Sequence, residues 1–158
     1  SRYIPRHEAL EKARRYCAYQ DRSHQEVWEK LKALNQEPAI AEELITELVE
    51  EGFLDEERFA CSYARGKFKH NRWGRQKIRQ GLKQKGIQPR LIQKAMEEIE
   101  DEAYQETLYR LLHKKLRELA GEDYRSQKTK VARYLTHKGY EQGLVWKAID
   151  EVLGKADS

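Results

Sequence analysis

The stretch that decides the fold is residues 78–99, which read IRQGLKQKGIQPRLIQKAMEEI. Its apolar residues recur three and four positions apart, the period of an amphipathic α-helix, and Gly86 separates them into two groups. Glycine readily adopts the left-handed backbone conformation that ends many helices. The stretch therefore predicts a helix, a tight turn at Gly86 and a second helix.

The same pattern occurs twice more along the chain. A shift of 53 residues forward aligns Gly86 with Gly139, and a shift of 51 residues back aligns it with Asn35. Asparagine is the next most common residue at such a turn. Apolar positions match under the same shifts, and a period of this length in a helical sequence indicates tandem three-helix units. We predict an all-α fold with three three-helix repeats, at residues 1–54, 55–100 and 101–158.

Charge is distributed unevenly over the 158 residues, although the net charge is only +4. Residues 1–57 carry 8 Lys and Arg with 14 Asp and Glu, whereas residues 97–158 carry 11 and 13. Residues 58–96 carry 12 Lys and Arg and no acidic residue. A block of one sign creates a strong local field, and its usual partner is a polyanion such as a nucleic-acid backbone. A solvated helix surface without a partner is the alternative interpretation.

Four cations of this basic block are spaced 3, 4 and 4 residues apart, namely Arg72, Arg75, Arg79 and Lys83. If a helix begins near Trp73, the spacing places them on one stripe of its surface, where guanidinium groups can bind phosphate. Trp73 either stacks on a base or packs between repeats. The candidate binding residues are Lys67, Lys69, Arg72, Trp73, Arg75, Arg79, Lys83 and Arg90. A weaker second patch comprises Arg125, Lys128, Lys130, Arg133 and Lys138, with Lys114 nearby, and adds Lys128, Lys130 and Arg133 to the candidates.

Several function classes find no support in the sequence. A phosphate-binding P-loop needs the pattern GxxxxGK[ST], which the segment from Gly74 to Gly81 does not supply. The Cys and His residues lack the spacing of a metal site. We therefore expect no enzyme, no cofactor and no metal site. No apolar run is long enough for a membrane helix, so we also expect no membrane partner. We further expect a cytoplasmic location and a monomer.

Short motifs follow one another in a fixed order. They are SHQEV (residues 23–27), EEGFL (50–54), DEERFA (55–60), GRQKIRQGL (74–82), KGI (85–87) and KGY (138–140). In their order, spacing and threefold repetition they resemble the motifs of the bacterial RecX regulatory proteins. The similarity runs from about Glu8 to Leu153. The chain departs from the family pattern at Asn35, where glycine is usual.

The resemblance implies a tandem array of three-helix repeats that is elongated and curved. It also implies a negative regulator of RecA recombinase that binds the RecA–ssDNA filament. The implied outcome is inhibition of filament extension, ATP hydrolysis, strand exchange and co-protease activity, which would modulate homologous recombination, DNA repair and the SOS response. The implied partners are the RecA filament and single-stranded DNA, met directly or within the filament.

Three alternatives remain open beside this one. A stand-alone nucleic-acid-binding helical repeat protein would use the same basic block without RecA. A sequence-specific reader of duplex DNA, of the helix-turn-helix type, would also be built from three-helix units. A purely structural helical scaffold would need neither partner. Comparing the affinity for bare DNA with the affinity for a RecA–ssDNA filament separates the first alternative from the filament regulator.

Overall fold

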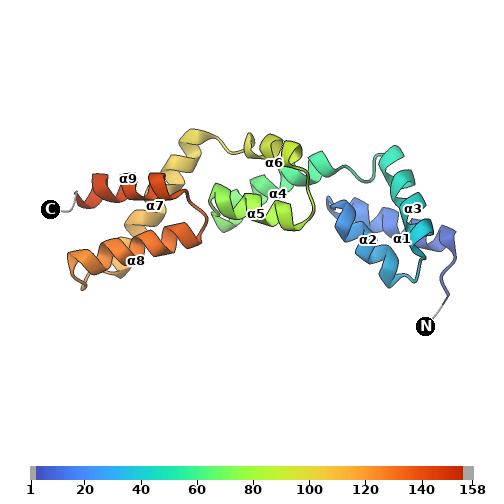
Figure 1. Cartoon of the computed structure of the whole chain (residues 1–158), viewed down its shortest axis with the longest axis horizontal. Helices are drawn as coiled ribbons and strands as arrows, with labels where there is room; N and C mark the ends of the chain where they lie inside the picture. The colour runs from blue at the N-terminus through green and yellow to red at the C-terminus, as the bar shows by residue number, and fades with distance from the viewer. Residues whose placement is uncertain (1–2, 155–158) are drawn as a thin grey trace. The chain divides into compact units, whose positions relative to one another are not determined.

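The computed structural model describes residues 3–154, and the regular secondary structure in this range is helical throughout (Figure 1). The helices of the described residues are α1 (Arg6–Tyr19), α2 (His24–Ala33), α3 (Pro38–Glu50), α4 (Glu56–Asn71), α5 (Arg75–Gln84), α6 (Pro89–Met96), α7 (Asp101–Glu118), α8 (Tyr124–His137) and α9 (Gln142–Leu153). The predicted all-α fold is confirmed. Within residues 3–154, no helix combines the length and the apolar character that crossing a membrane requires.

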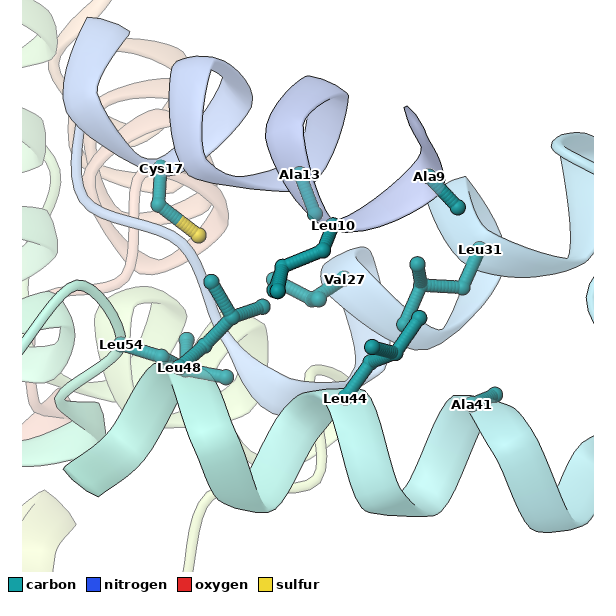
Figure 2. Packing of buried hydrophobic residues seen from close by; sticks show 10 residues of the cluster. All are labelled: Ala9, Leu10, Ala13, Cys17, Val27, Leu31, Ala41, Leu44, Leu48 and Leu54. Atoms are coloured by element: carbon teal, nitrogen blue, oxygen red, sulfur yellow. The ribbon is translucent and has the colours of Figure 1, made fainter. Parts of the chain in front are cut away.

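The first three helices show why the sequence folds locally as it does. Helix α2 begins with a capping box, in which the Ser23 hydroxyl accepts the Glu26 N–H at 3.1 Å and the Glu26 carboxylate accepts the Ser23 N–H at 3.0 Å. Helix α3 begins with Pro38, whose fixed φ suits the first helical turn. Their apolar stripes meet in one core (Figure 2), formed by Ala9, Leu10, Ala13, Cys17, Val27, Leu31, Ala41, Leu44, Leu48 and Leu54.

The second helix of each repeat ends in the same way. The second residue after the end of this helix has a positive φ, which is 59° at Asn35, 77° at Gly86 and 105° at Gly139. The next N–H donates to a carbonyl five residues earlier at 3.1 Å in all three repeats, as in a Schellman motif. The accepting residues are Leu31, Leu82 and Leu135, all of them fully buried. The repeat predicted from the aligned leucines and turn residues is thus visible in the backbone.

Helices α7, α8 and α9 also pack against one another. Each contributes one buried stripe, as α1–α3 do, and the stripe of α7 begins with the fully buried Tyr104. The other large side chains that are fully buried here are Tyr140, between α8 and α9, and Leu108, Leu112, Leu135 and Ile149. This core fixes the end of α8, where the candidate site lies.

The chain divides into two compact units, and the division passes through the middle repeat. The first unit comprises Ser1–Tyr63 and Leu82–Ala95, and the second comprises Ala64–Gly81 and Met96–Ser158. Helix α4 therefore changes unit after Tyr63, and α5 changes unit after Gly81. The compact units do not coincide with three separate three-helix bundles, because the middle repeat shares its helices between them.

Candidate nucleic-acid interface

A close backbone contact joins the start of α5 to the end of α8 within the second unit. The Gly74 N–H donates to the Lys138 carbonyl at 2.8 Å, and the Gln76 N–H donates to the Gly139 carbonyl at 2.9 Å. There is no room for a side chain, since a Cβ atom on Gly74 would lie 2.2 Å from the Gly139 carbonyl carbon. The two glycines therefore allow the ends of these helices to touch.

This contact brings together cations that are far apart in the sequence. Burial of the Lys138 ammonium lowers its pKa, and repulsion from Lys77, Arg72 and Lys114 lowers it further. The same ammonium donates to the Asn71 carbonyl at 3.0 Å. We call Arg72, Lys77, Lys114 and Lys138 the basic junction. Holding like charges together costs free energy, and a bound polyanion would offset that cost.

Arg72 lies directly after α4 in a left-handed backbone conformation, with a φ of 56°. Its carbonyl accepts a hydrogen bond from the Tyr140 hydroxyl at 3.0 Å, which fixes the turn to the third repeat. The side chain is exposed, and no carboxylate within residues 3–154 pairs with it. Helix α5 begins at Arg75, two residues after Trp73. The stripe expected from the 3-4-4 spacing is therefore incomplete, because Arg72 lies between α4 and α5 and not on the helix of the other three cations.

Trp73 is partly buried, and its ring contacts two lysines. The Lys67 ammonium lies 4.8 Å from the centroid of the indole, and the Lys77 ammonium lies 4.6 Å from it. Both distances are typical of cation–π contacts. The indole thus positions Lys77 of the basic junction next to Lys67.

Arg75 makes its contacts within the second unit, and its side chain is only 16% exposed. Its guanidinium donates to Asp101 at 2.6 Å and to Glu141 at 3.0 Å, and it stacks 3.9 Å from the centroid of the Tyr104 ring. The Tyr104 hydroxyl accepts the Arg75 backbone N–H at 2.9 Å and donates to Glu141 at 2.5 Å. Burial opposes ionisation of Glu141, but the hydrogen bonds from Tyr104 and Arg75 outweigh it and lower its pKa. Arg75 therefore links the start of α5 to the starts of α7 and α9. The carboxylates of Asp101 and Glu141 compensate its charge.

Lys128 is the repeat equivalent of Arg75, and it is buried in a similar way. Its ammonium lies 3.9 Å from an Asp150 carboxylate oxygen and 4.8 Å from the centroid of the Tyr124 ring. A carboxylate and a tyrosine thus hold the cation at both equivalent positions. Arg75 and Lys128 are both predicted binding residues whose charges face carboxylates of the second unit.

Two grooves on the second unit share His137. One, of about 270 Å³, is lined by Gln76, Lys77, Gln80, Thr136, His137 and Gly139. The other, of about 360 Å³, is lined by Lys115, Leu119, Lys130, Arg133, Tyr134 and His137. Neither lining contains an acidic residue, although Lys130 also pairs with Glu122 at 2.5 Å. Within residues 3–154, no three His, Cys, Asp or Glu side chains are grouped so that they could hold a metal ion.

The remaining predicted cations are exposed, and none makes an ion pair within the described part of the chain. They are Lys69, Arg79, Lys83 and Arg90. Arg79 donates to the Gln76 side chain at 3.2 Å. Lys69 and Arg79 belong to the second unit, whereas Lys83 and Arg90 belong to the first. The second unit therefore carries most of the candidate interface.

The sequence places Lys138, with Lys114 nearby, in a second patch separate from Arg72, and it leaves Lys77 without a place on the stripe. Lys114 and Lys138 lie in another repeat than Arg72, and the sequence does not show that α8 ends against the start of α5. The one available signal was the glycine pair, because Gly74 and Gly139 each follow or precede a cluster of basic residues. Close backbone approach needs glycine on both sides, but sequence alone does not pair two such positions.

The chain matches three models of known protein domains, one for each repeat. The first three-helix domain of RecX matches residues 9–48, the second matches residues 55–96 and the third matches residues 101–149. The order of the three domains along the chain is that of the family. Together the matches cover more than half of the sequence.

Curated relatives carry the same family name. The regulatory protein RecX of Lactobacillus johnsonii is 30% identical over 144 residues, which are 91% of this chain and 53% of the relative. The regulatory protein RecX of Bacillus mycoides is 28% identical over 142 residues, which are 90% of this chain and 53% of the relative. The chain thus spans about half the length of these curated relatives.

Solved structures agree with this fold. The crystal structure of RecX from Lactobacillus salivarius superimposes with a TM-score of 0.84 at 24% identity, covering 93% of this chain and 96% of that chain. A second crystal structure, of a regulatory protein RecX, gives a TM-score of 0.81 at 27% identity and covers 92% of this chain and 73% of that chain. With all three of its three-helix domains matched in order, the chain belongs to the RecX family.

Proposed function

We propose that the chain is a negative regulator of RecA recombinase that binds the RecA–ssDNA filament through its second unit. Binding would inhibit filament extension, ATP hydrolysis, strand exchange and co-protease activity, and so modulate DNA repair and the SOS response. Membership of a family whose curated relatives are named regulatory proteins supports the regulatory role. The observation that most supports the polyanion partner is the basic junction, where Lys138 at the end of α8 lies close enough to Arg72, Lys77 and Lys114 to be repelled by them.

The charge of the basic junction suits a phosphate backbone. Arg72 presents an exposed guanidinium without a carboxylate partner in the described residues, and its planar fork can donate two hydrogen bonds to one phosphate. The adjoining grooves have basic and neutral linings without acidic residues. A strand that follows both grooves would therefore meet one continuous sign of charge.

The candidate residues divide into three roles in this proposal. The phosphate-facing residues are Lys69, Arg72, Lys77, Arg79, Lys114, Lys130, Arg133 and Lys138. Lys83 and Arg90 would add contacts from the first unit. Lys67 and Trp73 would position Lys77, whereas Arg75 and Lys128 would stabilise the fold.

The test is the RecA ATPase on single-stranded DNA, measured with increasing amounts of the chain. The double variant Arg72→Gln/Lys77→Gln should need a higher concentration for half-maximal inhibition than the wild type. If both side chains meet single-strand phosphates, the log–log salt dependence of filament binding should flatten by about 1.4, from about 0.7 per phosphate. The matched control is Lys32→Gln/Lys147→Gln, which removes the same charge from two exposed positions outside both basic patches.

Other outcomes would point elsewhere. A double variant that loses filament binding but keeps its salt dependence on bare DNA would place the junction against acidic RecA surfaces. A wild-type chain that binds bare single strands as tightly as filaments, and leaves the ATPase unchanged, would be a stand-alone nucleic-acid binder. A double variant that inhibits at the wild-type concentration would remove the junction from the interface.

A further inference from the structure

The acidic first repeat carries a cluster of aromatic and basic side chains that the charge pattern had hidden. It is formed by Tyr16 and Tyr19 at the end of α1, by Arg22 in the link to α2 and by Lys30 on α2. The Arg22 guanidinium carbon lies 3.6 Å from the centroid of the Tyr16 ring and 5.9 Å from that of Tyr19, and the Lys30 ammonium lies 5.2 Å from the Tyr16 centroid. We call these four residues the aromatic platform.

Arg22 is fixed in place, yet its charge is not compensated by an ion pair. Its Nε donates to the Tyr16 carbonyl at 2.9 Å, while no carboxylate within residues 3–154 pairs with its terminal amino groups. The adjacent carboxylate of Asp21 is turned to other partners, accepting from Arg58 at 2.7 Å and from Ser62 at 3.1 Å. The outer edge of the guanidinium therefore remains available to an anion.

Tyr19 is the most exposed large apolar residue of the described chain, with 83% of its surface accessible. It is the last residue of α1 and takes no part in the core of the first unit. An open aromatic ring near a preorganised guanidinium, with an ammonium at the neighbouring Tyr16 ring, is an arrangement suited to single strands, because a base stacks on the open ring while the cations hold neighbouring phosphates.

We propose that the aromatic platform binds single-stranded nucleic acid, with one nucleobase stacked on Tyr19 and the adjacent phosphates held by Arg22 and Lys30. The platform reads the flat face of a base, which every base offers, whereas the basic junction responds to charge alone. The proposal rests on the proposed function in one respect, because it takes the bound nucleic acid to be the single-stranded DNA of a RecA filament. It gives the first unit a contact of its own with that strand.

The experiment compares two labelled oligonucleotides of equal length and charge, an oligo-dT of about 15 nucleotides and its abasic counterpart, by fluorescence anisotropy. The wild-type chain should bind oligo-dT about 5- to 10-fold more tightly than the abasic strand, as expected for one stacked base. Tyr19→Ala should abolish this ratio, and Tyr19→Phe should retain it because the ring remains. Circular dichroism of both variants should match the wild type, since the side chain is exposed.

The Arg72→Gln/Lys77→Gln variant separates the two sites. It should bind both oligonucleotides more weakly and keep the wild-type ratio between them, because it removes charge without touching the platform. Equal wild-type affinity for both strands, no binding of either strand, or a ratio that survives Tyr19→Ala would each overturn the platform. If the ratio survives in Tyr19→Ala but ATPase inhibition is lost, Tyr19 contacts a protein partner instead of a base. The wild-type ATPase assay tests the proposed function independently of these binding results.

Discussion

Arg72 occupies a backbone position that glycine would fill at lower cost. A left-handed conformation costs a residue with a Cβ atom about 1–2 kcal/mol, and replacement by glycine removes this cost. The greater freedom of glycine in the unfolded chain offsets part of the stability gained. We therefore expect Arg72→Gly to raise the free energy of unfolding by about 0.5–1 kcal/mol, measured by urea denaturation. Because it also removes a cation of the basic junction, the variant should inhibit the RecA ATPase less well than the wild type.

Asn35 offers a matched control in the first unit, since it has a φ of 59° and lies outside the basic junction. Asparagine tolerates this conformation better than arginine, so Asn35→Gly should change stability less. Its ATPase inhibition should equal that of the wild type. A loss of stability in Arg72→Gly would contradict the interpretation, because it would show that the arginine side chain is retained for folding.

At the scale of the elements, the turns that end α5 and α8 share a conformation but differ in their surroundings. A Cβ atom on Gly86 would meet nothing within 4 Å, whereas a Cβ atom on Gly139 would lie 2.4 Å from the Cβ of Lys77. Gly86→Ala should therefore cost about 1 kcal/mol, from backbone strain alone. Gly139→Ala should cost about 2–4 kcal/mol, because overpacking adds to the strain.

Gly139→Ala should also separate the start of α5 from the end of α8 and so disperse the basic junction. Thermal denaturation measures the first effect, and binding to RecA filaments measures the second. Gly86→Ala should retain filament binding. Equal stability losses in the two variants would mean that the backbone at Gly74 and Gly139 can move apart at little cost. The basic junction would then not depend on this contact.

The helices and their repeat could be predicted from the sequence because the signals are local. Gly86 and Gly139 end helices through their own backbone freedom. The aligned leucines lie four residues before these glycines. Asn35 was predicted to take the same conformation from its residue type, and its φ of 59° confirms this. None of these inferences needed to know which helix lies beside which.

The candidate site could be predicted only in part, because its geometry depends on distant partners. Arg75 was assigned to phosphate from its spacing, yet its carboxylate partners lie 26 and 66 residues further along the chain. A periodic pattern gives the face of a helix on which a side chain lies, but it does not show what that face meets. The aromatic platform was missed for a different reason: counting charges over 57 residues conceals a small basic cluster within an acidic repeat.

At the scale of the whole molecule, three sequence repeats are distributed over two compact units. The middle repeat contributes one part of α4 and α5 to each unit. In a strictly modular repeat protein, each repeat would gain or lose structure together with its immediate neighbours. Here we expect the cooperative blocks to follow the compact units, since residues that share a core lose their protection together.

Leu82 and Leu135 distinguish these two possibilities, because they are equivalent in the repeat but belong to different units. Each is fully buried, so replacement by alanine should cost about 2–5 kcal/mol. In native-state hydrogen exchange, Leu82→Ala should reduce amide protection in α1–α3 as well as in α6, while α7–α9 stay protected. Leu135→Ala should do the reverse. If Leu82→Ala lowers amide protection only in residues 55–100, the repeat is the cooperative block. If protection falls equally throughout the chain, the two units unfold as one.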